Sequence, residues 1–252
     1  MTPERTELEW TYEPTNYFEA PYRHSAIEYG LLVEDGHVLA TLTTPTAPVS
    51  DHLEQRVKAM IDGIFLVRQL QTHRGYTLQG PRTYQHSAGR KDVSIRLGGV
   101  AALALAGQLD VVVRNAAGEI TLDSRSDRIE ADKALLDGIA PKVVHSQLLR
   151  SLLDSYSRSI ADLDNELVHL YEVRDSLSTH FGGEQQARDT LQIAKAEWQR
   201  LGVLANVEPL AQGRHRGKHP GNKRIATTAE LEDARALVRG WILSFASTIE
   251  AG

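Results

Sequence analysis

The chain has 252 residues, 41% of them hydrophobic, so it is long enough to bury the core of one large domain or two small ones, and this composition argues against disorder of the whole chain. Its formal net charge of −5 at pH 7 argues against a protein that coats nucleic acid by bulk attraction, so any contact with RNA or DNA must be local. Because the chain contains no cysteine, disulfides, thiolate nucleophiles and metal sites built on sulfur are excluded as well.

The chain shows no targeting or membrane signal. Its opening, MTPERTELEW, is polar and acidic, which indicates neither a signal peptide nor a transit peptide. The longest apolar stretch, from Gly98 to Leu109, is much shorter than the roughly 20 residues that a membrane-spanning helix needs. We therefore expect a cytoplasmic protein without a membrane span.

The first half of the chain carries β-strand signals around one helix. Two β-rich runs, 27–33 and 38–43, flank an Asp-Gly turn that is typical of a hairpin. Ser50 can cap a helix over residues 51–73, where apolar residues recur at helical spacing. Further short strands are predicted at residues 76–78, 93–97, 111–114 and 119–122.

One run in this half is ambiguous. Residues 98–107 are almost continuously apolar and fit either a buried helix or a buried strand, because a short apolar run does not reveal its period. Residues 1–122 are nevertheless predicted to form a small β-rich domain with one helix, and we expect this domain to act as a sensor or regulatory element. The whole chain is then an α+β protein.

From residue 127 to residue 252 the sequence predicts an all-α helical bundle. The expected helices cover residues 127–139, 141–181, 184–195, 196–210 and 228–249. Pro141 suits a helix start and Gly182-Gly183 suits a helix stop, while Thr227 and Glu230 form a capping box ahead of the last helix. The apolar stripe of that last helix needs partner helices to cover it.

The loop expected between the last two helices concentrates basic residues. From Arg214 to Arg224 it holds five Lys or Arg and two His within eleven positions. Arginine and lysine supply positive charge for a phosphate, and histidine exchanges a proton near neutral pH. These are the groups that metal-free RNA cleavage requires. The alternative is that the loop only caps helix ends and solvates the surface.

Arg214, four intervening residues and His219, placed between the last two helices of a bundle, resemble the motif of the HEPN superfamily. His215 occupies the position directly after the arginine, where that motif often has a polar residue. The resemblance extends over residues 141–250, and Gly217 with Pro220 makes the motif more loop-like here than is usual in the superfamily.

The resemblance implies a domain that forms a homodimer and brings two Arg–His motifs into one cleft, where RNA is cut without a metal. Arg214 and His219 would be the catalytic residues. His215, Arg216 and Lys218 would help to bind the phosphate backbone. Members of the superfamily include ribonuclease toxins and antiphage defence proteins, and also silent domains that bind nucleotides or proteins.

A second hypothesis is a non-catalytic, dimerising adaptor whose basic loop docks an acidic partner or a nucleotide. Neither hypothesis calls for a cofactor or a metal. Glu166 and His169 have the Glu-x-x-His spacing of di-iron sites in helical bundles, but the sequence has no second copy of this motif on an expected helix. We therefore expect these two residues to lie on a solvated or interfacial helix face.

Overall fold

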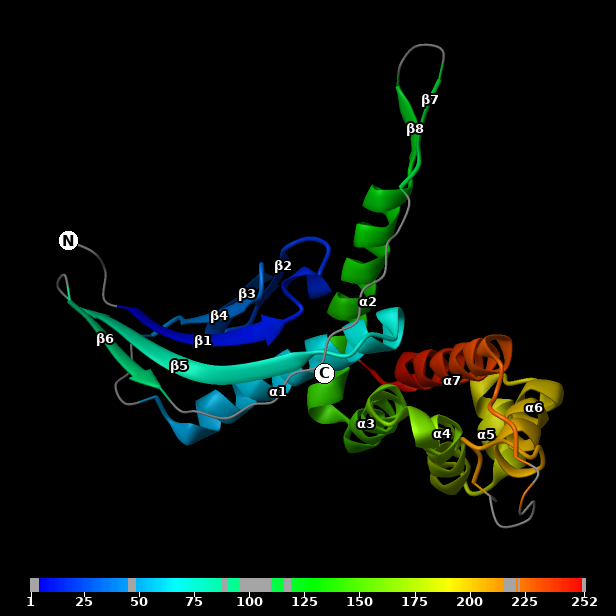
Figure 1. Cartoon of the computed structure of the whole chain (residues 1–252). Coiled ribbons are helices and arrows are strands. Elements are labelled where there is room, and N and C mark those ends of the chain that lie inside the picture. Colours follow the sequence, from blue (N-terminus) through cyan, green and yellow to red (C-terminus); the bar gives the residue numbers. More distant parts are fainter. Residues whose placement is uncertain are drawn as a thin grey trace. The chain divides into compact units, whose positions relative to one another are not determined.

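The computed structural model of the chain describes residues 5–44, 49–87, 90–95, 110–115, 119–214, 221 and 223–250 (Figure 1). Its contacts divide the chain into two compact units. The sheet unit is made of Met1–Ile61 and Arg74–Asp137, and the helical unit is made of Asp62–His73 and Gly138–Gly252. Two helices contribute residues to both units: α1 (Asp51–Thr72) and α2 (Ser124–His145).

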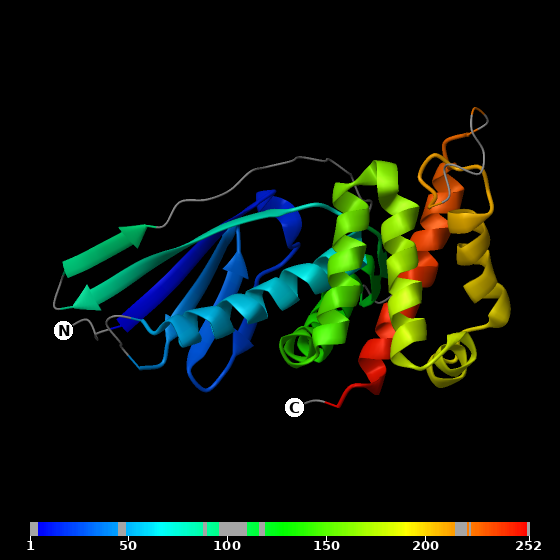
Figure 2. The same cartoon turned by 90° about the horizontal axis from the view of Figure 1, so that it is seen from below.

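The sheet unit is built on a six-stranded antiparallel sheet with the strand order β2-β3-β4-β1-β5-β6. Its elements are β1 (Arg5–Glu13), the 3-10 turn η1 (Thr15–Tyr17), β2 (Tyr22–Ser25), β3 (Tyr29–Glu34), β4 (His37–Leu42), β5 (Thr77–Ser87) and β6 (Arg90–Ile95). The first half of α1 runs along this sheet (Figure 2), and its Val57 and Ile61 side chains are fully buried.

Strand β1, which lies between β4 and β5, was missed by the sequence prediction. It has the alternation of a strand with one buried face, since Leu8, Trp10 and Tyr12 are at most 2% exposed. Gly80 of β5 packs directly against it: a Cβ at this position would lie 2.8 Å from the carbonyl oxygen of Glu9. Glycine is therefore required there.

Strand β2 was missed as well, whereas the hairpin and the helix of the sheet unit were predicted correctly in kind. The hairpin is confirmed as β3 and β4, and its turn residues Asp35 and Gly36 both have positive φ. The helix expected over residues 51–73 is α1, and the Ser50 side chain caps it by accepting a hydrogen bond from the backbone N–H of Leu53 at 3.3 Å.

Two strand predictions were too short or displaced. The strand expected at residues 76–78 is the start of β5, which continues to Ser87, and its partner β6 begins at Arg90 rather than at residue 93. A glycine and a proline inside β5 hide its length in the sequence pattern. The ambiguous run at residues 98–107 lies outside the described residues.

A separate two-stranded hairpin, made of β7 (Val112–Arg114) and β8 (Ile120–Asp123), leads directly into α2. This helix begins at Ser124, earlier than predicted, and the Asp123 carboxylate caps it by accepting from the backbone N–H groups of Arg125 and Ser126, both at 3.1 Å.

The prediction that Pro141 starts a helix is wrong. Pro141 lies inside α2, which continues to His145. Proline in a helix interior removes one backbone hydrogen bond. Packing overrides this cost here, because the neighbouring residues Ala140 and Val143 are at most 1% exposed.

The helical unit contains, after α2, the elements α3 (Gln147–Ala161), η2 (Leu163–Asn165), α4 (Glu166–His180), α5 (Glu184–Leu191), α6 (Lys195–Asn206) and α7 (Thr228–Thr248). The single helix expected over residues 141–181 is therefore divided. The first break is at Ser146, whose side chain caps α3 by accepting from the backbone N–H of Leu149 at 3.2 Å. The second is at Asp162 and Asn165, whose side chains hydrogen-bond to each other at 2.8 Å in competition with the helix backbone. The stop predicted at Gly182-Gly183 is confirmed, with both glycines at positive φ.

Helix α4 is the centre of the helical unit and contacts α3, α5, α6 and α7. Its Leu167, Leu170 and Leu177 are fully buried, so these leucines belong to the core of the chain itself. Helix α7 carries the predicted capping box, formed by Thr227 and Glu230, and buries the centre of the expected stripe, from Ala234 to Phe245. The chain thus has the predicted α+β class, and none of the described helices is long and apolar enough to cross a membrane.

Candidate functional site

The loop that joins α6 to α7 carries the basic cluster, and its two ends are held together. Leu210 and Arg224 form a parallel β-bridge. The backbone N–H of Ala211 donates to the carbonyl of Arg224, and the N–H of Arg224 donates to the carbonyl of Pro209, each at 2.9 Å. The loop therefore has a closed base. Residues 215–220 and 222 lie outside the described residues.

Arg214 is anchored to the end of α6 through its backbone. Gly213 packs so closely against this helix that a Cβ there would lie 3.0 Å from the carbonyl oxygen of Ala205. The backbone N–H of Arg214 donates to the same oxygen at 2.7 Å. Ala205 is in the last turn of α6, where carbonyl groups lack an intrahelical partner. The contact satisfies this helix end and fixes the position from which the Arg214 side chain begins.

The Arg214 side chain is held on α4. Its guanidinium carbon lies 4.4 Å from the centre of the Tyr171 ring, within the range of a cation–π interaction. Its Nη1 donates to Asp175 Oδ2 at 2.9 Å. The side chains of Arg214 and Asp175 are 35% and 51% exposed, so this ion pair lies at the surface and is worth little by itself. The ring and the carboxylate together orient the guanidinium.

Below Arg214, cations and aromatic rings alternate into the core. The guanidinium carbon of Arg174 lies 4.9 Å from the Tyr171 ring centre and 5.0 Å from that of Trp198. The Trp198 ring in turn packs against Trp241 of α7, with ring centres 5.0 Å apart. All three aromatic residues are at most 8% exposed. Arg214 therefore rests on a packed stack that extends from α4 through α6 to α7.

Arg174, within this stack, is held by further partners. It donates through Nη1 to the Tyr171 hydroxyl and through Nη2 to Glu184 Oε2 at 3.1 Å. Gly202 of α6 makes room for it, because a Cβ there would already lie 3.4 Å from Nη1 of Arg174. The partners fix Arg174 as a structural cation beneath the surface.

The other end of the loop is held by Arg224. Its Nη1 and Nη2 donate to the two carboxylate oxygens of Glu230 at 2.8 and 2.6 Å. The Arg224 guanidinium, followed by the backbone N–H of Thr227, lowers the pKa of the Glu230 carboxyl to about 2. Arg224 thereby ties the loop to the capping box of α7.

The structure places one of the five predicted site residues. Arg214 is described, whereas His215, Arg216, Lys218 and His219 lie outside the described residues. Their predicted roles remain predictions.

Sequence analysis missed the residues that hold Arg214. Tyr171, Arg174 and Asp175 lie three and four positions apart on α4, which places them on one helix face. This spacing of an aromatic, a cation and an anion was the available signal.

A second polar cluster lies inside the helical unit. Glu166, 1% exposed, accepts hydrogen bonds from Nε and Nη2 of Arg235 at 2.5 and 2.9 Å. His73 contacts the Tyr156 hydroxyl through Nδ1 at 3.2 Å, and its Nε2 lies 3.8 Å from Glu166 Oε1. Burial lowers the pKa of His73 to about 4 and raises that of Tyr156 to about 12. We assign this cluster a structural role.

The side chains of Glu166 and His169 do not converge on a common metal-binding position. Glu166 is buried against Arg235, which corrects the expectation of a solvated or interfacial face for this residue. His169 instead contacts Asp162 Oδ2 through Nε2 at 3.3 Å and Glu172 Oε2 through Nδ1 at 3.5 Å. The two ring nitrogens thus have separate partners. Among the described residues, no group of three or more His, Asp or Glu side chains is arranged to hold a metal ion.

Comparison of the chain with models of protein families, with curated proteins and with solved structures gives no match. The features of this chain that bear on its function are the geometry around Arg214 and the motif that this residue opens.

Proposed function

We propose that the protein is a metal-independent endoribonuclease of the HEPN type, with Arg214 and His219 as its catalytic residues. The observation that supports this most is the way in which Arg214 is held. Tyr171 and Asp175 orient its guanidinium at the surface, directly before the segment that carries His219 in the sequence. A side chain that is ordered in advance loses less entropy when it binds a phosphate.

In the proposed reaction the ribose 2′-hydroxyl attacks the adjacent phosphorus and gives its proton to a base. The bond from phosphorus to the 5′-oxygen breaks as that oxygen receives a proton, which leaves a 2′,3′-cyclic phosphate and a 5′-hydroxyl. His219 transfers a proton in this sequence, and Arg214 stabilises the negative charge that develops on the phosphorane. His215, Arg216 and Lys218 bind the neighbouring phosphates.

The contact with Asp175 is compatible with this role of Arg214. It is made by Nη1 to one carboxylate oxygen, whereas a guanidinium carries five N–H donors. Asp175 thus acts as a positioning residue that keeps the fork in one orientation. A homodimer, which is part of the proposal, would place two such arginines with two histidines in one cleft. The sheet unit would then serve as the sensor or regulatory element, and a toxin or defence role belongs to the same proposal.

A non-catalytic adaptor is the second candidate, and a different observation favours it. The two described arginines of the loop already have carboxylate partners, Asp175 for Arg214 and Glu230 for Arg224. Such pairing is typical of a loop whose arginines stabilise the fold. In this alternative the loop docks an acidic protein or a nucleotide and leaves it unchanged.

Cleavage and binding of a fluorescent single-stranded RNA, measured on the same full-length preparations, separate the two candidates. We expect His219→Ala to lower the cleavage rate by roughly 10²-fold while RNA binding changes little. Arg214→Lys keeps the charge but loses the planar fork, so the nuclease loses activity, whereas an adaptor accepts lysine. His52→Ala, at an exposed histidine of α1, is the matched control.

The nuclease proposal is rejected if the wild-type protein, shown to be dimeric, leaves RNA intact from about pH 5 to pH 9. It is also rejected if His219→Ala changes only the binding of a partner.

A further inference from the structure

The hairpin formed by β7 and β8 exposes apolar side chains that lack a covering layer among the described residues. Its five large apolar residues are about half exposed: Val111 46%, Val112 51%, Val113 45%, Ile120 52% and Leu122 44%. The two strands form a sheet of their own. A two-stranded hairpin is at best marginally stable in water, and further strands or packing against a helix are needed for independent stability. Because its apolar side chains are about half exposed, no described helix covers them, and added strands can supply the missing stability.

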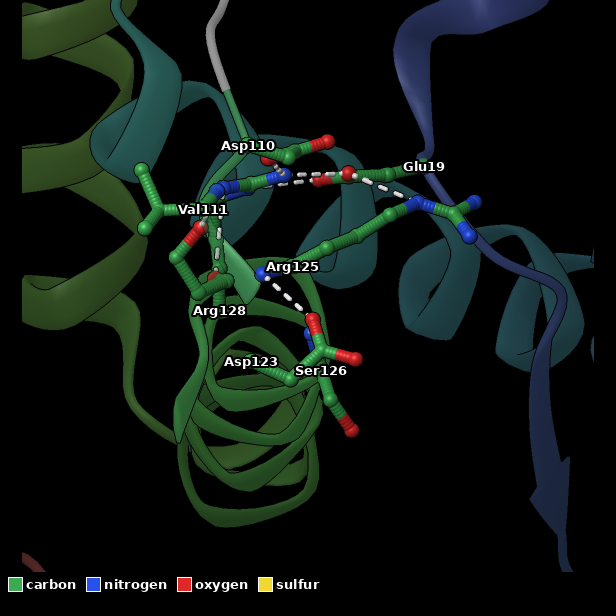
Figure 3. A network of polar contacts seen from close by, with 8 residues as sticks. Glu19, Asp110, Val111, Asp123, Arg125, Ser126 and Arg128 are labelled. Carbon is green, nitrogen blue, oxygen red and sulfur yellow. Dashed lines mark hydrogen bonds and ion pairs between the residues drawn. The ribbon is translucent and has the colours of Figure 1, made fainter. Parts of the chain in front are cut away.

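The base of the hairpin is fixed, so its strands are presented in a defined direction from α2 (Figure 3). Arg128 of α2 donates to Glu19 Oε2 through Nε at 2.7 Å and to Asp110 Oδ1 through Nη2 at 2.8 Å. The Ser124 hydroxyl accepts from the backbone N–H of Val111 at 2.8 Å. These contacts connect the start of β7 to the first turns of α2, which follows β8 directly in the chain.

The hydrogen bonds within the hairpin show which edge of β7 faces away from β8. The carbonyl of Val111 accepts from the backbone N–H of Ser124, and the N–H of Asn115 donates to the carbonyl of Glu119. Successive residues of a strand direct their backbone groups to opposite edges, so residues 111, 113 and 115 face β8. The backbone groups of Asp110, Val112 and Arg114 therefore face the other edge, where no described strand pairs with β7.

The sequence along this edge is complementary to itself. In an antiparallel pair of two copies centred on Val112, Asp110 lies opposite the partner's Arg114, and Arg114 lies opposite the partner's Asp110. Val111 lies opposite the partner's Val113. Cross-strand pairs of opposite charge and of β-branched residues both stabilise a sheet. Asp110 can serve Arg128 and the partner together, because a carboxylate accepts several hydrogen bonds.

Other arrangements lose this complementarity. A shift of the register by two residues places Asp110 opposite Val112 or Ala116, depending on its direction, and an in-register parallel pair places Asp110 beside its own copy. Pairing through β8, centred on Thr121, would bring Glu119 opposite Asp123, two like charges. The charged residues thus favour pairing along the edge of β7 in the register centred on Val112.

We propose that β7 pairs with β7 of a second copy of this chain, in an antiparallel register centred on Val112. The two hairpins then form one four-stranded sheet, which has enough strands to be stable, whereas a single hairpin does not. This interface lies wholly within the sheet unit and does not rest on the proposed nuclease activity.

Cysteine cross-linking tests the register directly, since the chain contains no other cysteine. In the proposed pair, residue 111 faces the partner's residue 113 at a site without backbone hydrogen bonds, where Cα atoms are about 4.5 Å apart. A disulfide fits this distance. Two copies of residue 111 are offset along the strands by about 7 Å and do not fit.

We therefore expect a mixture of Val111→Cys and Val113→Cys proteins, one of them carrying a tag, to form the mixed disulfide dimer under mild oxidation. Each variant alone should give roughly tenfold less dimer. Equal cross-linking in the mixture and in the separate samples, or no cross-linking in any of them, overturns the proposal.

A charge exchange provides the second measurement. Asp110→Arg and Arg114→Asp should each raise the dimer dissociation constant of the sheet contact about tenfold, and the double exchange should restore it. Sedimentation equilibrium of the full chain measures this, and circular dichroism checks that α2 is retained. If the double exchange is as weak as the single ones, the register is wrong.

Discussion

At the scale of single residues, the Tyr171 ring beneath Arg214 should matter for activity. A cation–π contact of this kind contributes about 0.5–2 kcal/mol. We expect Tyr171→Leu, which removes the ring, to lower RNA cleavage roughly tenfold, and Tyr171→Phe, which keeps it, to retain most of the activity. Thermal unfolding of both variants controls for stability. Equal cleavage by the leucine and wild-type proteins would show that the ring does not position Arg214.

His73 should make the stability of the protein depend on pH. Burial lowers its pKa from 6.5 to about 4, so between these values the unfolded chain binds a proton that the folded chain does not. The contribution of His73 to the free energy of unfolding should therefore be fully present above about pH 6.5. It should be lost as the pH is lowered toward 4, which lowers the free energy of unfolding by up to about 3 kcal/mol.

His73→Asn removes the titrating group and tolerates the positive φ of 49° at this position. Urea unfolding at a series of pH values should thus show a shallower acid slope for His73→Asn than for the wild type. Identical slopes would exclude His73 as the source of the pH dependence.

The residues of the site were only partly predictable. Arg214 stood out because positive charge is concentrated around it in the sequence. Tyr171 and Asp175 did not, because they meet Arg214 across 39 and more positions of the chain, and only the packing of the loop against α4 brings them together. Glu166 was misjudged for the same reason, since its partner Arg235 lies on a different helix.

At the scale of elements, the capping box of α7 should contribute measurably to stability. The Thr227 side chain accepts from the backbone N–H of Glu230, and the Glu230 carboxylate accepts from the backbone N–H of Thr227 at 2.8 Å. We expect Thr227→Ala to lower the free energy of unfolding by about 1 kcal/mol. Thr228→Ala, one position further inside the helix, is the matched control and should be neutral or slightly stabilising. Equal midpoints of denaturant unfolding for both variants would contradict the capping role.

Elements with local signals were predictable, and those that depend on packing were not. The Asp35-Gly36 turn, the Thr227 cap and the glycines after α4 each act through their immediate neighbours, and each was predicted. Strand β1 was missed although its alternation of polar and apolar residues is a local strand signal. Pro141 was misread because the packing of α2, which no local pattern reveals, keeps the helix intact around it.

At the scale of the whole molecule, the α+β class followed from the change from strand to helix patterns along the chain. The predicted domain boundary between residues 122 and 127 stays a prediction. The assignment of residues 62–73 to the helical unit could not be inferred from the sequence, because an apolar stripe does not tell which neighbours will cover it. This segment contributes His73 to the buried cluster that contains Glu166.

The most direct test of the central claim uses a DNA oligonucleotide that contains a single ribonucleotide, incubated with the full-length protein and a chelator. Attack by a ribose 2′-hydroxyl requires cleavage at that one position, a 2′,3′-cyclic phosphate on the product and loss of roughly 10²-fold in rate with His219→Ala. Cleavage at deoxyribonucleotides, dependence on added metal, or an unchanged rate in His219→Ala would contradict the account.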